Sequence, residues 1–168
     1  VHRTRGALNV PQKTATLHTN HGDIVINLFA DHAPKTVDNF VGLVSGTKEW
    51  THPETREKVK RPFYDGLTFH RVISNFMIQG GCPLGTGSGG PGFEIKCETA
   101  GKKQVHKRGS LSMAHRGKDT GGSQFFICHA PQGHLDRKHT VFGQVTSGLE
   151  VVDKIQAGDK MTRVWIEP

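Results

Sequence analysis

Long apolar runs are absent from this sequence. No stretch approaches the roughly 18 residues that a membrane span needs, and no charged segment is followed by an apolar one as in a secretory signal. Cysteine is scarce as well: Cys82, Cys97 and Cys128 are an odd number and form no Cys-x-x-Cys pair. We therefore predict no membrane association, a reducing, cytoplasmic setting and no metal site, because the cysteine spacing matches no short zinc-ligand pair.

Aromatic residues are few, at 7% of the chain, although the formal net charge is +7. Basic residues cluster at 56–61 and 102–108, and neither cluster contains an aromatic residue. Proteins that bind single-stranded nucleic acid usually combine such charge with exposed rings on which bases stack. We interpret both clusters as solvated loop faces and do not expect nucleic acid as a partner.

Signatures of cofactor binding and nucleophilic catalysis are incomplete. Gly85, Gly87 and Gly90 satisfy the spacing G-x-G-x-x-G, but Pro91-Gly92 follows where a phosphate-binding helix would have to begin. Ser123 lies in Gly-Gly-Ser-Gln-Phe, which is not a nucleophile elbow. A Ser-His-Asp set could be assembled by chance from 11 histidines. We expect no cofactor and no covalent intermediate.

Glycine is abundant, with 21 residues, and helical periodicity is short, which favours a mostly β domain with one core. Residues 1–13 show no periodicity and are interpreted as a basic tail before a single domain at 14–168. Strands are predicted at 14–19 and 23–29 around a turn, then near 68–73, 76–79, 93–96, 110–114, 124–129, 141–145 and 162–166. Helices are predicted from Pro34 to Gly46 and from a Ser147–Glu150 capping box to Gly158, with a long surface loop at 47–62. Many short strands with two helices indicate a barrel or sandwich plugged by helices.

One stretch, Phe69–Gly81, combines polar and charged side chains with large apolar ones. Arg71 and Gln79 lie among large apolar side chains, whereas a half-exposed strand would alternate apolar and polar residues. This composition is typical of a surface that grips an apolar group while fixed donors act on something attached to it.

Five motifs in order give a family resemblance: Phe-His-Arg-Val-Ile at 69–73, Phe-Met-Ile-Gln-Gly-Gly at 76–81, Ser-Leu-Ser-Met-Ala at 110–114, Gly-Ser-Gln-Phe-Phe-Ile at 122–127 and His-Thr-Val-Phe-Gly at 139–143. From about residue 14 to its end the chain resembles the cyclophilins, which are peptidyl-prolyl cis–trans isomerases, and looks most like bacterial cytoplasmic members. The resemblance implies a closed eight-stranded antiparallel barrel capped by two α-helices. It also implies a monomeric, cofactor-independent isomerase that assists folding by acting on proline-containing polypeptides.

The resemblance also implies roles for individual residues. Arg71 would donate to the prolyl nitrogen of the twisted amide, Gln79 and Gln124 would orient it and the substrate, and His70 would be a structural neighbour. The proline pocket would be lined by Phe76, Met77, Phe126, Leu135 and His139. The substrate backbone would pair with Ala114, His115 and Arg116, and Gly87 would border the groove. Adjacent strand residues face opposite sides, so we predict Phe126 in the pocket and Phe125 in the outer layer.

Two departures from the family pattern modify these expectations. His134 stands at the pocket rim where many eukaryotic members have Trp, so we expect weakened cyclosporin binding. Arg116, in a His-Arg pair that replaces the usual Asn-Ala, adds positive charge and predicts a preference for acidic residues near the target proline. The alternative function is a proline-recognition or holdase-type chaperone that uses the same groove without turnover.

Overall fold

The structure, a computed structural model, describes residues 13–167, so the predicted tail lies outside the described residues except for Lys13. Within these residues the chain forms two α-helices, a 3-10 turn and ten strands. The strands are β1 (Lys13–Thr19), β2 (Gly22–Leu28), β3 (Trp50–Thr51), β4 (Lys58–Val59), β5 (Arg71–Ile73), β6 (Met77–Gly80), β7 (Ser110–Met113), β8 (Phe125–Cys128), β9 (Val141–Ser147) and β10 (Met161–Glu167). The helical elements are α1 (Pro34–Ser45), η2 (Gly133–Leu135) and α2 (Leu149–Lys154).

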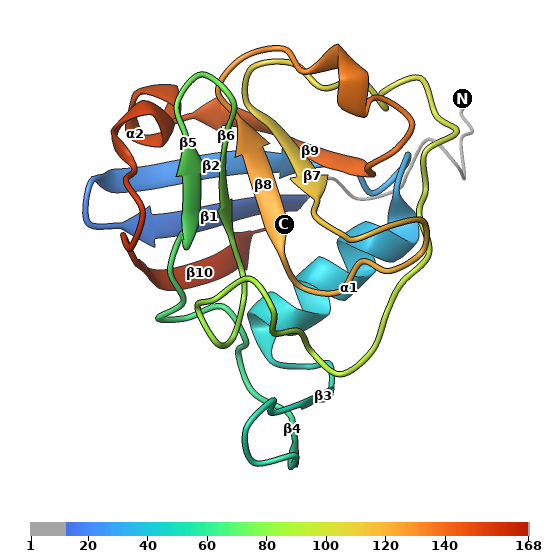
Figure 1. Cartoon of the computed structure of the whole chain (residues 1–168), viewed down its shortest axis with the longest axis vertical. Coiled ribbons are helices and arrows are strands. Elements are labelled where there is room, and N and C mark those ends of the chain that lie inside the picture. Colours follow the sequence, from blue (N-terminus) through green and yellow to red (C-terminus); the bar gives the residue numbers. More distant parts are fainter. Residues whose placement is uncertain (1–12, 168) are drawn as a thin grey trace, which may run out of the picture.

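Eight of these strands form one antiparallel sheet in the order β10-β1-β2-β9-β7-β8-β6-β5. The two helices lie on opposite sides of the molecule in Figure 1. The mostly β fold with two helices agrees with the prediction. Because β10 and β5 stand at the two ends of the order, strand pairing gives an open eight-stranded sheet and does not show the predicted closed barrel.

The β1–β2 hairpin follows directly from its sequence. Apolar residues at every second position of β2, Ile24, Ile26 and Leu28, are fully buried, as are Ala15 and Leu17 of β1. This alternation places one face of the sheet on the core and the other toward the outside.

The first helix begins and ends where the sequence predicts. Pro34 opens α1, and Gly46 ends it in the left-handed conformation with φ 80°. Its N-terminal N–H groups find a partner 62 residues away: the carboxylate of Glu98 accepts bonds from Thr36 N at 2.6 Å and from Lys35 N at 3.2 Å. An acidic group at this end also interacts favourably with the helix dipole.

Three local predictions were wrong. Residues 93–96 form no strand, only one isolated bridge between Ile95 and Gly121, because the segment packs its apolar side chains as a loop. Ser147 does not cap α2: it is the last residue of β9, and Gly148 occupies the cap position with φ 97°, where a side chain would meet the backbone of Asp23. The same helix ends at Lys154 rather than at Gly158.

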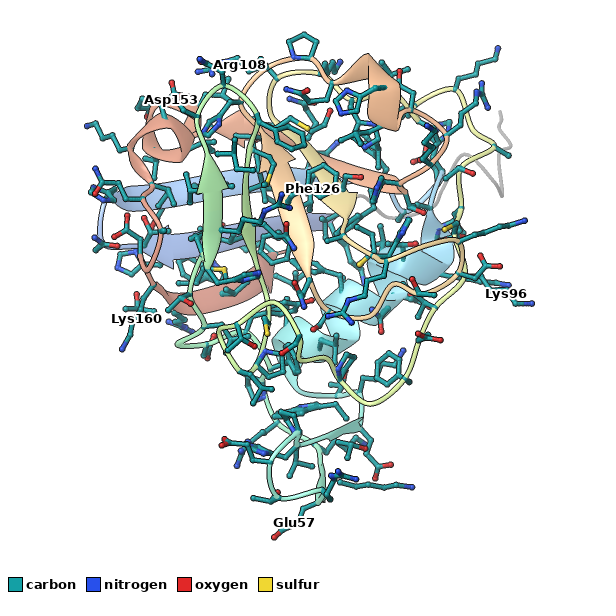
Figure 2. All side chains as sticks on the ribbon, in the orientation of Figure 1. Glu57, Lys96, Arg108, Phe126, Asp153 and Lys160 are labelled. Atoms are coloured by element: carbon teal, nitrogen blue, oxygen red, sulfur yellow. The ribbon has the colours of Figure 1, made fainter. Side chains whose placement is uncertain are left out.

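The predicted loop at 47–62 contains a small hairpin, β3–β4, that projects from the sheet with Glu57 near its tip (Figures 1 and 2). Its base is fixed by Trp50, which is 5% exposed and packs edge-on against Phe63 at 4.8 Å. Among the described residues, no helix is both long and apolar enough to cross a membrane.

Candidate active site

A row of directly paired residues crosses four strands of the sheet. Arg71 of β5 pairs with Gln79 of β6, Gln79 with Phe126 of β8, and Phe126 with Ser112 of β7. Directly paired residues of antiparallel strands project to the same face, so these four side chains lie together on the outer face. Sheet register therefore brings the Arg71 guanidinium and the Gln79 amide next to the ring of Phe126 (labelled in Figure 2), which lies on a strand distant from both in the sequence.

Strand alternation also separates the two neighbouring phenylalanines, but in a different way from the prediction. Phe126 lies in an outer apolar cluster with Met77 and Cys128. Phe125 is 1% exposed and belongs to the main core, where its ring meets that of Tyr64 at 5.7 Å. The prediction of Phe125 in the outer layer was wrong. The candidate site lies on the outer face of the sheet, so Phe125, the neighbour of Phe126 on β8, points inward to the core.

Apolar side chains line one end of a groove of about 1000 Å³ that lies over this face. Met77 is 2% and Phe126 5% exposed, and the partly buried Phe76, Ala114 and Leu135 pack against them. A concave apolar surface of this kind suits a small aliphatic ring that remains attached to a longer chain.

Amide groups connect the groove wall to the guanidinium. Gln124 Nε2 donates to the carbonyl oxygens of Gly87 and Gly89, both at 2.9 Å, and its Oε1 accepts from Gln79 Nε2 at 3.1 Å. Gln79 Oε1 then accepts from Arg71 Nη1 at 3.4 Å. Within residues 13–167 no carboxylate lies within 4.0 Å of Arg71, so this exposed cation has donors left for a ligand.

The glycine-rich loop that borders the groove is wrapped around a sulfur atom. The backbone N–H groups of Gly87 and Gly89 each donate to Cys82 Sγ at 3.3 Å. Burial raises the pKa of the Cys82 thiol, but bonds from the backbone N–H groups of the loop outweigh burial and leave the pKa below its ordinary value. Gly87 has φ 91° and lies against the His70 ring, which explains the glycine at this position.

Two stacked histidines form another wall. The rings of His115 and His139 lie 4.1 Å apart at 13°. His139 Nδ1 donates to the carbonyl of Met113 at 2.9 Å, and its ring meets Phe126 edge-on at 5.5 Å. Burial, followed by the charges of His115 and other nearby histidines, lowers the pKa of His139 although the Met113 carbonyl raises it. His139 therefore presents a neutral imidazole to the groove at neutral pH.

Most of the residues singled out from the sequence meet in this one groove. It is lined by Arg71, Phe76, Met77, Gln79, Gly87, Ala114, His115, Arg116, Gln124, Phe126, Leu135 and His139. Two are not brought into the lining. His134 is exposed, with its ring 6.0 Å from that of Phe76. His70 lies behind the loop, with Nδ1 buried and unpartnered among the described atoms, and its pKa is lowered first by burial and then by the charge of Arg71.

Sequence reasoning missed the far end of the groove. This end is lined by residues 88–94 of the glycine-rich loop together with Thr120, Gly122 and Ser123. A Cβ atom at Gly122 would come within 2.8 Å of Pro91, so that glycine permits the close approach of the loop. The dense glycines at 85–92 were the available signal, but they indicate a tight turn without indicating what it borders.

The sequence also drew attention to a possible nucleophile, Ser123, and to possible metal ligands. Ser123 is 1% exposed and donates its hydroxyl to the carbonyl of Gly81 at 2.8 Å, with no imidazole on its oxygen. Across residues 13–167 no three His, Cys, Asp or Glu side chains are grouped to hold a metal ion.

Comparison with known proteins gives a consistent result. Residues 14–167 match the family described as cyclophilin type peptidyl-prolyl cis-trans isomerase/CLD. The chain is 54% identical over 144 residues to peptidyl-prolyl cis-trans isomerase B of Bacillus subtilis, covering 86% of this chain and 90% of the relative. A peptidyl-prolyl cis-trans isomerase of Helicobacter pylori is 54% identical over 147 residues, with 86% and 81% covered.

Solved structures agree with the sequence comparison. The crystal structure of a cyclophilin type peptidyl-prolyl cis-trans isomerase of Cryptosporidium parvum superposes with a TM-score of 0.79 at 27% identity, covering 94% of this chain and 99% of that one. A second crystal structure of that protein, in the presence of the dipeptide Ala-Pro, gives a TM-score of 0.76 at 27% identity, with coverages of 92% and 99%.

Proposed function

This chain belongs to the cyclophilin-type peptidyl-prolyl cis-trans isomerases, so its activity is the rotation of X–Pro peptide bonds, and we propose that the outer-face groove over β5, β6 and β8 is where that rotation takes place. The single observation that carries the assignment is the placement of an uncompensated guanidinium, Arg71, on the same sheet row as the apolar floor residue Phe126. A proline ring on that floor brings its own nitrogen toward the guanidinium.

Physical chemistry explains why such a site suffices. Rotation of a peptide bond faces a barrier of about 18–20 kcal/mol because amide resonance is lost at the twisted midpoint. For X–Pro the planar isomers differ by only about 0.5–1 kcal/mol, so a catalyst needs only to favour the twisted amide over both of them. The twisted prolyl nitrogen regains a lone pair and becomes a hydrogen-bond acceptor. A donor aimed at this nitrogen therefore binds the transition state more strongly than either planar form.

Arg71 suits this task because a guanidinium stays protonated and presents a planar fork of donors. In our proposal Gln79 and Gln124 keep the fork oriented, and the amide contacts from the glycine-rich loop to Arg71 support this role. Phe76, Met77, Phe126, Leu135 and His139 hold the proline ring. The backbone of residues 114–116 pairs with the extended substrate, and His70 supports the loop.

The test is an isomerisation assay on a short X–Pro peptide. Wild-type protein accelerates cis–trans exchange, and Arg71→Ala lowers kcat/KM by about 10–100-fold, which corresponds to the loss of a charge-assisted hydrogen bond of about 1.5–3 kcal/mol. The matched control is Arg163→Ala, which removes an exposed strand arginine stacked on Trp165 and remote from the groove. An Arg71→Ala protein that is folded and as active as Arg163→Ala would falsify the assignment.

Substrate preference is a further part of this proposal. Arg116 lines the groove, is exposed, and among the described residues has no carboxylate within 4.0 Å. We propose that it favours acidic residues near the target proline, with Glu94 in the same groove acting in the opposite sense. Peptides with Glu or Lys beside the proline, compared at low and high salt with wild type and Arg116→Ala, measure the effect. A Glu-to-Lys ratio that Arg116→Ala leaves unchanged contradicts it.

Five further properties complete the proposal. We propose that the sheet closes into a barrel, supported by backbone bonds that join residues 66–69 to 158–161, such as Gly66 N to Met161 O at 2.7 Å and Phe69 N to Asp159 O at 2.8 Å. We propose that the protein is a monomer. We also propose a cytoplasmic location, supported by three unpaired cysteines. Its substrates are proline-containing polypeptides in folding, where it assists as a chaperone. Cyclosporin binds weakly because exposed His134 replaces a larger aromatic ring.

A further inference from the structure

A buried histidine that the proposed chemistry does not use lies directly behind the proline pocket. The side chain of His106 is 0% exposed, and its ring is stacked on that of Phe126, with centroids 5.8 Å apart and planes at 10°. A second histidine, His139, meets the same ring edge-on. Phe126 thus contacts two imidazoles, of which His139 lines the groove and His106 does not.

Each polar group of His106 has a hydrogen-bond partner. Its ring Nδ1 lies 2.9 Å and its backbone N–H 2.7 Å from the carboxylate oxygen Oδ1 of Asp136, and its carbonyl accepts the N–H of Gln132 at 3.1 Å. On the other side of the ring, Nε2 lies 2.8 Å from Ser112 Oγ. A histidine with this many partners cannot change its ring orientation without breaking several buried bonds at once.

The partners determine the protonation pattern. Because Nδ1 faces a carboxylate, it carries the proton, and Nε2 is the acceptor for the Ser112 hydroxyl at 2.8 Å, which also lies 3.2 Å from the carbonyl oxygen of Thr140. Burial lowers the pKa of His106 against the opposing effect of Asp136, whose own pKa is lowered by the bonds from His106 despite burial. At neutral pH the ring is therefore neutral beside an ionised carboxylate.

The contacts between Ser112, His106 and Asp136 resemble a nucleophilic triad, but the arrangement cannot act as one. Ser112 is 0% exposed on a sheet strand and does not line the groove, so no substrate carbonyl can reach it. The three residues instead connect two parts of the pocket. Ser112 neighbours Phe126 on the sheet, and Asp136 directly follows Leu135 of the pocket wall.

We propose that His106 is a positioning residue for the isomerase: its fixed ring sets the height of the Phe126 floor, and its bonds to Asp136 hold the Leu135 wall at the matching distance. The inference rests on the proposed function, because it assumes that Phe126 and Leu135 form the pocket that binds the proline ring. It adds a residue that never touches the substrate but determines how deeply the proline ring can enter.

A displaced floor weakens the binding of planar and twisted amide alike, so KM should rise while kcat changes little. For His106→Ala, which removes the ring packed against Phe126, we expect KM for an X–Pro peptide to rise about 10-fold, which is less than the roughly 100-fold cost of misplacing reacting groups by 1 Å. His106→Phe restores a ring behind the floor, and we expect KM to return to within about threefold of wild type although stability does not.

Gln104→Ala is the matched control. Gln104 is equally buried, lies two residues away, and makes two bonds to the backbone of Val141, at 2.7 and 2.8 Å, without contact to the pocket. It should lose stability with unchanged KM. A folded His106→Ala protein with wild-type KM overturns the proposal, and so does an equal rise of KM in Gln104→Ala.

Asp136→Ala provides an answer even if His106→Ala does not fold, because the Asp136 side chain is 31% exposed. We expect its KM to rise several-fold, by about 3–10 times. Its control is Asp153→Ala, which removes a carboxylate paired with Arg108 at 2.8 Å outside the groove and should leave KM unchanged. Unchanged KM in Asp136→Ala overturns the proposal.

Phe126→Ala separates this inference from the proposed function. If Phe126→Ala loses activity while both His106 variants keep the wild-type KM, the positioning role alone is refuted. If Phe126→Ala is fully active, the pocket assignment itself is refuted, and the positioning role with it.

Discussion

Replacement of Gln124 by alanine gives the sharpest test of how the groove is organised. Among residues 13–167, Gln124 is the one side chain that bonds both to the glycine-rich loop and to the amide that contacts Arg71. Gln124→Ala removes three hydrogen bonds, two donated to backbone carbonyls at 2.9 Å and one accepted from Gln79 at 3.1 Å. The change creates no large cavity in the main core.

The expected magnitudes follow from these bonds. Each contributes about 1 kcal/mol net, and water can replace part of them because Gln124 is only half-buried, so we expect a loss of about 2 kcal/mol in the free energy of unfolding. This corresponds to a decrease in Tm of about 4–8 °C. Loss of the orientation of Arg71 adds a decrease in kcat/KM of about 10-fold, equivalent to about 1.4 kcal/mol of transition-state stabilisation.

Gln144→Ala separates the two effects. Gln144 also donates two bonds to backbone carbonyls, of Arg108 at 2.9 Å and of Val145 at 3.3 Å, but it lies on β9 outside the groove. Thermal unfolding and a peptide isomerisation assay are measured on both variants. Equal losses of stability with activity reduced only in Gln124→Ala support the amide connection. Equal activity in both variants would refute it, as would full additivity of Gln79→Ala and Gln124→Ala in a double-mutant cycle.

Other predictions follow from the same geometry. Phe126→Ala should lose most activity, with a smaller loss of stability than Phe125→Ala. Phe125→Ala should lose about 3–5 kcal/mol in the free energy of unfolding because it leaves a cavity in the main core. Urea unfolding and the peptide assay measure both variants, and the reverse pattern would contradict the assignment of faces. Burial lowers the pKa of His106 and of His139 below the ordinary 6.5, so both fold as neutral rings that the unfolded chain would protonate. Their contribution to stability is complete above about pH 6.5 and is lost as the pH falls toward their folded-state pKa values. The urea midpoint should therefore be lower at pH 5.5 than at pH 7.5. An unchanged midpoint would contradict the burial of two neutral histidines. His134→Trp should increase cyclosporin affinity several-fold in a fluorescence titration, and an unchanged affinity would contradict the proposed effect of this rim position.

Local sequence rules predicted the elements whose determinants are local. Pro34 and Gly46 delimit α1, and period-two alternation defines β1 and β2, because backbone preference and burial act within a few residues there. The boundary of α2 was mispredicted because Gly148 lies against the backbone of Asp23, a contact that no local pattern encodes.

Other contacts that position the helices and the groove join residues far apart in the sequence, and no local pattern predicts them. Glu98 caps α1 from 62 residues away, and His106 reaches Phe126 and Asp136 across the groove floor. Most groove residues were predicted through family motifs. Alternation showed that Phe125 and Phe126 face apart, but it could not show which face was the core.

If the proposed site is correct, activity also depends on the alignment of the strands that carry the outer-face row. A slip of one residue in β8 would exchange Phe125 and Phe126, exposing a core ring and turning the pocket floor inward. Misaligned chains would therefore be unstable and inactive for the same reason. Insertions or deletions should consequently be rare in these strands over evolution, while the tip of the β3–β4 hairpin, around Glu57, can vary in length without moving the row.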